Sequence, residues 1–275
     1  MPDRIQILID LALREDIGTG DITTEALFGN ESREKQAIIL AKQDLVIAGL
    51  EIAKRVFRTV DTNLSWERYY EDGAVLVKGT TVAKISGSLQ SILKAERTAL
   101  NFLQHLSGIA TLTRQCVQKV AKYSVQILDT RKTLPGFRAF EKHAVKVGGG
   151  QNHRLGLYDR YLIKDNHLEG ISITEALQKA KRHNKNKVPL EIEIDSPSQI
   201  EEAIAAGADI LLMDNFFPKE LKKAVKEVAG RAQVEASGGI NLHNVEDYAK
   251  TGVDFISLGF LTHSAPAADL SLEVS

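Results

Sequence analysis

Residues 189–215, PLEIEIDSPSQIEEAIAAGADILLMDN, decide the fold, because a strand, a helix and a second strand follow one another there. The apolar runs at 189–195 and 209–215 are typical of buried strands, and the residues between them have helical spacing. The same rhythm continues on both sides of this unit. Further strands are predicted at 125–130, 161–165, 233–239 and 254–259, and helical patterns follow the second to fifth strands. Strands and helices alternating at this spacing predict right-handed βα units and a parallel sheet.

Six strands fall short of the eight in a complete barrel, so we expect an open, incomplete TIM-like α/β barrel. The first third of the chain has a mixed pattern instead. Strands are predicted at 36–43, 64–70 and 80–87, and helices at 4–14 and 49–60. Between 89 and 122 the helical period indicates one or two helices, interrupted near Gly108.

The bulk composition excludes several classes of protein. The 275 residues carry 35 basic and 36 acidic side chains, which argues against a nucleic-acid or membrane partner. No apolar run approaches the roughly 20 residues that cross a bilayer, and the amphipathic start does not resemble a signal peptide. A single cysteine, Cys116, excludes an internal disulfide and a cysteine-rich metal site. We therefore expect a cytoplasmic protein.

Acidic side chains alternate with apolar ones in two of the strands. Glu191, Glu193 and Asp195 share one face of their strand, and Asp214 shares a face with Leu212. Because helices cover the outer face of a barrel, we expect these carboxylates to point inward. A barrel interior is normally apolar, so the acids indicate a bound ligand or metal. Carboxylates suit Mg²⁺ or the hydroxyl groups of a sugar. A partly buried salt bridge is the alternative for each.

Nearly every predicted strand ends in charged residues or glycines, and barrel enzymes place their chemistry at these ends. Two of the ends, 235–244 and 257–264, contain small residues followed by a helical pattern. Exposed backbone N–H groups and a helix amino end favour a phosphate there, whereas an ordinary tight turn is the alternative. The strand-end residues are Asp129 to Lys132, Lys164, Asp165, Glu193 to Asp195, Asp214, Asn215, Ser237 to Gly239 and Ser257 to Gly259.

Cations gather between residues 129 and 167, where eight Lys or Arg stand against four acids. Four of them lie at or near strand ends and suit a carboxylate or phosphate ligand, namely Arg131, Lys132, Arg154 and Lys164. Four others are interpreted as solvated charge, namely Arg138, Lys142, Lys146 and Arg160. His153 could be a core histidine, a structural hydrogen bonder or part of the pocket.

Long segments of the chain resemble the quinolinate phosphoribosyltransferase family. They include LDTRKTLPGFR, KHAVKVGGGQNHRLGLYDRYLIKDNH, EIEIDSPSQIEEA, EASGGIN and, towards the amino terminus, REDIGTGDITT and ERTALNFLQHLSGIATLT. The resemblance implies an amino-terminal α/β sandwich domain at 1–108, joined by the tail 264–275, and an open barrel domain at 109–263. It also implies a homodimer or a higher homo-oligomer. The implied reaction joins quinolinate to 5-phosphoribosyl 1-diphosphate with Mg²⁺, giving nicotinate mononucleotide, diphosphate and carbon dioxide.

The resemblance also implies roles for individual residues. The quinolinate-binding set is Arg97, Thr130, Arg131, His153, Arg154 and Lys164, with Arg97 inserted from a neighbouring subunit. Lys132, Glu193 and Asp214 are the implied catalytic residues, and the two acids also hold Mg²⁺, directly or indirectly. The phosphoribosyl diphosphate set adds Ser237, Gly238, Gly239, Ser257, Gly259 and His263 to those three.

Other functions remain open from the sequence. Close alternatives are the related branch associated with molybdenum transport and a transferase that accepts nicotinate, with its one carboxylate. A barrel aldolase would use Lys132 or Lys164 as a Schiff-base amine. A non-catalytic sensor would bind a phosphorylated ligand without releasing diphosphate.

Overall fold

The computed structural model describes residues 4–29, 31 and 33–275. Its internal contacts divide the chain into two compact units. The first comprises the residues up to Leu112 together with Ala265–Ser275, and the second is Thr113–Ser264. Each unit has its own sheet, antiparallel in the first and parallel in the second.

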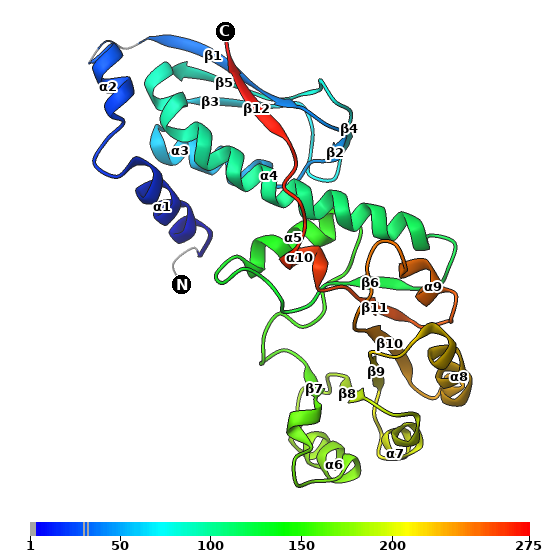
Figure 1. Cartoon of the computed structure of the whole chain (residues 1–275). Helices are drawn as coiled ribbons and strands as arrows, with labels where there is room; N and C mark the ends of the chain where they lie inside the picture. Colours follow the sequence, from blue (N-terminus) through cyan, green and yellow to red (C-terminus); the bar gives the residue numbers. More distant parts are fainter. Residues whose placement is uncertain (1–3, 30, 32) are drawn as a thin grey trace. The chain divides into compact units, whose positions relative to one another are not determined.

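The first unit is built on a four-stranded antiparallel sheet in the order β12-β1-β5-β3. The carboxy-terminal strand β12 lies beside β1 and completes this sheet (Figure 1). A separate pair, β2 and β4, is also antiparallel. The strands are β1 (Glu34–Ala41), β2 (Leu45–Val46), β3 (Ser65–Arg68), β4 (Val75–Leu76), β5 (Thr81–Ser88) and β12 (Leu270–Val274). The three strands predicted in the first third of the chain are thus confirmed.

Four helices belong wholly or partly to this unit: α1 (Arg4–Ile17), α2 (Ile22–Phe28), α3 (Leu50–Val60) and α4 (Leu89–Val120). Asp21 caps the amino end of α2, because its carboxylate accepts a hydrogen bond from the Thr24 backbone N–H at 3.0 Å. α3 buries one apolar face that includes Val56 and Phe57. That amphipathic face is the reason for its helical spacing.

The expected interruption near Gly108 is wrong, because α4 is one continuous helix of 32 residues. Gly108 is instead a point of close approach. A Cβ atom at this position would lie 2.0 Å from the carbonyl oxygen of Pro266. Glycine therefore lets the tail pass directly against the helix, and the helical backbone itself is undisturbed.

The second unit contains all six predicted parallel strands, in the order β6-β11-β10-β9-β8-β7 (Figure 1). They are β6 (Gln126–Leu128), β7 (Tyr161–Ile163), β8 (Leu190–Ile194), β9 (Ile210–Asp214), β10 (Gln233–Ser237) and β11 (Phe255–Ser257). The helices after them are α5 (Arg138–Val147), α6 (Ile173–His183), α7 (Ile200–Ala205), α8 (Pro218–Val228), α9 (Val245–Ala249) and α10 (Phe260–His263). Among the described residues, no helix combines the length and the apolar character needed to cross a bilayer.

β6 and β7 are the two edges of this sheet, so the barrel is open as expected. β6 makes one further bridge, between Leu128 and Gln151. This bridge places the segment after Gln151 beside the β6 edge, where a closed barrel would have another strand. His153 and Arg154 thus follow closely after a residue paired with the β6 edge.

Candidate active site

A cavity of about 830 Å³ lies at the carboxyl ends of the parallel strands. It is lined by 14 of the 15 residues predicted for the site, namely Thr130, Arg131, Lys132, His153, Arg154, Lys164, Glu193, Asp214, Ser237, Gly238, Gly239, Ser257, Gly259 and His263. The remaining residue, Arg97, lies on α4 in the first unit and is exposed. Six strand ends therefore converge on one cavity, as parallel topology requires.

Arg131 and Arg154 supply positive charge to this cavity from two separate segments. Arg154 is only 5% exposed. Burial lowers the pKa of its guanidinium, and the nearby charge of Arg131 lowers it further. Two like charges near one another, of which Arg154 is buried and Arg131 half-buried, favour the binding of an anion, which would relieve both effects.

Lys164 and two acids form the centre of the cavity. The Lys164 ammonium lies 3.0 Å from Oε2 of Glu193, as an ion pair. Burial raises the pKa of Glu193 and that of Asp214, while Lys164 opposes the rise in both. Carboxylate oxygens of Glu193, Asp195 and Asp214 come within 4.8 Å of one another.

The inward face predicted for β8 is confirmed for Glu191 and Glu193. Glu191 is 1% exposed and Glu193 is 7% exposed. Asp195 lies one residue beyond the strand and is exposed, but its carboxylate comes within 4.8 Å of those of Glu193 and Asp214.

His153 joins a buried acidic pair beneath the cavity. Its Nε2 lies 2.8 Å from Oε2 of Glu191 and 3.7 Å from Oε2 of Glu235. Burial opposes a charge on the ring, but the hydrogen bond and charge of Glu191 raise the pKa of His153. Burial and the neighbouring Glu191 raise the pKa of Glu235 to about 7. Glu235 also accepts a hydrogen bond from the Ser257 hydroxyl.

Glu235 is a cavity residue that sequence reasoning missed. It lies in β10, two residues before Ser237 and therefore on the same face. The alternation argument used for Glu193 applies equally to QVEAS and would have found it.

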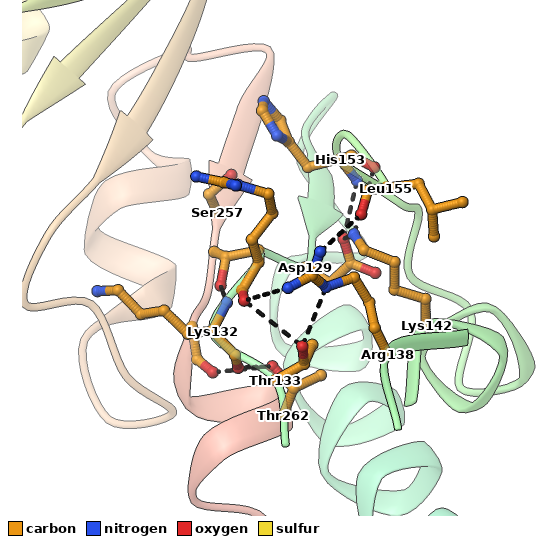
Figure 2. Close-up of polar contacts among 12 residues, drawn as sticks. Asp129, Lys132, Thr133, Arg138, Lys142, His153, Leu155, Ser257 and Thr262 are labelled. Atoms are coloured by element: carbon orange, nitrogen blue, oxygen red, sulfur yellow. Dashed lines mark hydrogen bonds and ion pairs between the residues drawn. The ribbon is translucent and has the colours of Figure 1, made fainter. Parts of the chain in front are cut away.

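The interpretation of Lys142 as solvated charge is wrong. Lys142 is 1% exposed and its ammonium pairs with Asp129, which is fully buried (Figure 2). Asp129 Oδ1 also accepts a hydrogen bond from the backbone N–H of His153 at 2.9 Å. Arg138 is half-buried, lines the cavity and donates three hydrogen bonds within the chain, so it is more than solvated charge, whereas Lys146 is exposed as expected. A basic residue in a helix gives no sign of its burial when its partner lies 13 positions away.

The chain matches two family models that together cover most of its length. One describes the quinolinate phosphoribosyl transferase C-terminal domain and matches residues 109–273, and the other describes the N-terminal domain and matches 21–107. The chain belongs to the quinolinate phosphoribosyltransferase family.

Individual relatives of this family member are similar over nearly their whole length. A probable nicotinate-nucleotide pyrophosphorylase [carboxylating] of Bacillus subtilis is 43% identical, with 99% of this chain and 94% of the relative covered. A mitochondrial quinolinate phosphoribosyltransferase [decarboxylating] of Nicotiana tabacum is 38% identical, with 97% and 81% covered. The solved nicotinate-nucleotide pyrophosphorylase of Francisella tularensis has a TM-score of 0.95 at 40% identity, with 99% and 96% covered.

Two glycines of this phosphoribosyltransferase-family cavity have close contacts within the chain. A Cβ on Gly238 would lie 2.2 Å from Oδ1 of Asn215, and φ at Gly238 is +91°. A Cβ on Gly259 would lie 3.0 Å from Cδ of Lys132. The helix α9 begins only at Val245, so the expected helix amino end is not adjacent to Gly239. Hydrogen bonds between Asn241 and Asn244 form a turn in between.

Proposed function

We propose that this chain transfers the phosphoribosyl group of 5-phosphoribosyl 1-diphosphate to quinolinate and releases diphosphate and carbon dioxide, giving nicotinate mononucleotide for NAD biosynthesis. The observation that carries the proposal is the single cavity in which the buried Arg154 and further cations stand beside the acids Glu193 and Asp214, in a chain that belongs to this family. We assign this chemistry to the barrel domain, 109–263.

Quinolinate carries two neighbouring carboxylates, and we assign their binding to Thr130, Arg131, His153, Arg154 and Lys164. The two guanidiniums can each form paired hydrogen bonds with a carboxylate. The burial that lowers the pKa of Arg154 also excludes water, so that each charge pair formed there is stronger than at the surface. A monocarboxylate would leave one of these cations without a partner, which favours the dicarboxylate.

We assign phosphoribosyl diphosphate to Lys132, Glu193 and Asp214 and to the loops at Ser237 to Gly239 and Ser257 to Gly259, with His263. The cluster of oxygen donors from Glu193 and Asp214 fits Mg²⁺, which prefers carboxylates and retained water. When bound, Mg²⁺ would neutralise diphosphate charge as that group leaves. We infer that the two acids hold it directly or through water.

The bonds change in two steps. The ring nitrogen of quinolinate bonds to C1′ of the ribose as the bond from C1′ to diphosphate breaks, and the leaving group takes the electron pair. Glu193 and Asp214 stabilise the positive charge that develops on the ribose. The ring nitrogen is then cationic, so the adjacent carboxylate can leave as carbon dioxide, and a proton takes its place. The chain positions and neutralises the reactants, and no covalent nucleophile is required.

We propose that the site is completed in a homodimer or a larger homo-oligomer, in which Arg97 of one subunit enters the cavity of another. The exposure of Arg97 on α4 supports this assignment, because an arginine without buried partners is available to a second copy.

The aldolase alternative requires a neutral lysine amine. In this structure the Lys164 side chain is instead engaged in an ion pair with Oε2 of Glu193 at 3.0 Å, which argues against its use as a free nucleophile.

The test mixes the purified chain with quinolinate, phosphoribosyl diphosphate and Mg²⁺ and follows nicotinate mononucleotide and diphosphate by chromatography. We expect both products in equal amounts, and none when either substrate is omitted. Equal turnover of nicotinate and quinolinate would favour the transferase for one carboxylate. Binding without release of diphosphate would favour the sensor and would overturn the proposal.

A further inference from the structure

Arg138 binds three groups of two different segments that surround the cavity (Figure 2). It is the first residue of α5 and is half-buried. Its Nε donates to Oγ1 of Thr133 at 3.1 Å, and its Nη2 donates to the carbonyl oxygen of Arg131 at 3.4 Å. Its Nη1 donates to the carbonyl oxygen of Leu155 at 3.0 Å. One guanidinium thus links the loop after β6 to the chain that follows His153.

These two segments carry the other two arginines of the cavity, Arg131 and Arg154, whose charges repel one another. Arg131 belongs to the first segment and Arg154 to the second, and the charge of Arg131 lowers the pKa of Arg154. Without a constraint on the backbone, repulsion would drive the two guanidiniums apart when no anion is bound. Arg138 donates hydrogen bonds to the backbone carbonyl oxygens of Arg131 and Leu155, so it constrains the backbone of both segments.

Other contacts hold the second of these segments as well. The backbone N–H of Leu155 donates to Asp159 at 2.7 Å, so both peptide groups flanking the Leu155 Cα are fixed. Deeper in the unit, Asp129 binds the backbone N–H of His153 and the ammonium of Lys142. Arg138 is the half-exposed member of this set, so its substitution disturbs the core less than that of Asp129 or Lys142.

We propose that Arg138 is a positioning residue that holds Arg131 and Arg154 at the spacing required by the two carboxylates of the acceptor. This inference rests on the proposed function, because it deepens the assignment of the dicarboxylate end of the cavity. Arg138 acts through the two backbone carbonyls rather than through its charge. A fork of several N–H groups in one plane is needed for that task, and a lysine ammonium does not provide it.

The experiment measures the dissociation constants of quinolinate and nicotinate by calorimetry, and the KM for phosphoribosyl diphosphate, in wild type, Arg138→Ala and Arg138→Lys. We expect both variants to bind quinolinate about 10-fold or more weakly, since small misplacements at a preorganised site are costly. Binding of nicotinate and the KM for phosphoribosyl diphosphate should change by less than about threefold, because the proposed spacing concerns two carboxylates. Guanidinium ion at millimolar concentration should partly restore quinolinate binding in Arg138→Ala but not in Arg138→Lys.

The matched control is Lys146→Ala, which removes one positive charge from the same helix at an exposed position and should leave all three constants unchanged. Quinolinate binding by Arg138→Lys at the wild-type level would overturn the proposal, because charge alone would then suffice. Equal weakening of all ligands would also overturn it. If Arg138→Ala fails to fold, Thr133→Val removes one acceptor with little change of shape and should weaken quinolinate binding alone by a smaller factor. Failure of the proposed function is distinguishable, because wild type would then form no nicotinate mononucleotide.

Discussion

Nε2 of His153 lies 2.8 Å from Oε2 of Glu191. His153 comes two residues after Gln151, which pairs with the edge strand β6, whereas Glu191 lies in β8. This hydrogen bond spans the interior of the unit and is completely buried. It continues to Glu235 and Ser257 on β10 and β11. The floor of the cavity is therefore a polar network, where an ordinary barrel has packed apolar side chains.

The network predicts that stability falls as pH rises towards neutrality. The pKa of Glu235 is raised from 4.5 to about 7, so the folded chain retains a proton that the unfolded chain loses. The free energy of unfolding should then decrease from about pH 4.5 to about pH 7, by up to about 1.4 kcal/mol per pH unit. His153 acts in the same direction, because its pKa is also raised and its contribution is lost as pH rises through the folded value.

The check is urea unfolding of wild type and Glu235→Gln between about pH 5 and pH 8. The glutamine keeps the shape and an acceptor for Ser257 but cannot titrate, so the slope should diminish. Glu227→Gln, at an exposed position of α8, should leave the slope unchanged. An identical slope in Glu235→Gln and wild type would show that Glu235 titrates normally.

Arg154→Ala and Lys164→Ala should each reduce kcat/KM by about 100-fold or more while the chain remains folded. Arg154→Ala removes a buried cation from the quinolinate end, and Lys164→Ala also frees Glu193 from its ion pair. Initial rates and far-ultraviolet circular dichroism test both expectations. The control Lys179→Ala breaks only an exposed pair with Glu175, which contributes little. Near-normal turnover in both cavity variants would show that the carboxylate-binding set is misplaced.

Gly238→Ala should destabilise the chain by about 1–3 kcal/mol and lower activity, because the new Cβ meets Asn215 at 2.2 Å and φ is +91°. Gly239→Ala separates the two causes. Gly239 has φ of +62° but no atom within 4 Å of an added Cβ, so only the backbone cost of about 1 kcal/mol applies there. Thermal unfolding of both variants measures the difference. Equal destabilisation would mean that the contact with Asn215 has no energetic consequence.

Arg97→Ala and Lys164→Ala should complement one another if Arg97 enters the cavity of a second subunit. Each variant alone lacks a complete site, whereas a mixed dimer contains one intact site and one doubly altered site. After unfolding and refolding of an equal mixture, about a quarter of wild-type activity should return. Mixing without refolding serves as the control. No recovery, in a mixture proved by mass spectrometry to contain mixed dimers, would place Arg97 in its own subunit's site or outside any site.

Sequence patterns predicted the parallel strands well because each is a short apolar run bounded by charged residues or glycine, as in 189–195 and 209–215. They predicted most of the cavity because parallel strands bring their carboxyl ends together, which places Glu193 beside Asp214. Predictions failed where contacts between distant segments decide the outcome. Gly108 lies within a continuous helix and allows the tail to pass close to it, Lys142 is buried in a pair with Asp129, and Arg138 donates hydrogen bonds to two neighbouring segments.

The amino-acid sequence alone determined the order of strands and helices along the chain, the face of β8 that points inward and the family of the protein. The first two follow from local periodicity, and the family follows from long matching segments. Tertiary structure decided which charges are buried and which pair. The ion pair of Lys142 with Asp129, the links of Arg138 and the reach of His153 to Glu191 depend on segments that meet only after the sheet has formed. The energetic cost of burying a charge depends on the groups that surround it in the folded chain, and the residues adjacent in the sequence do not determine those groups.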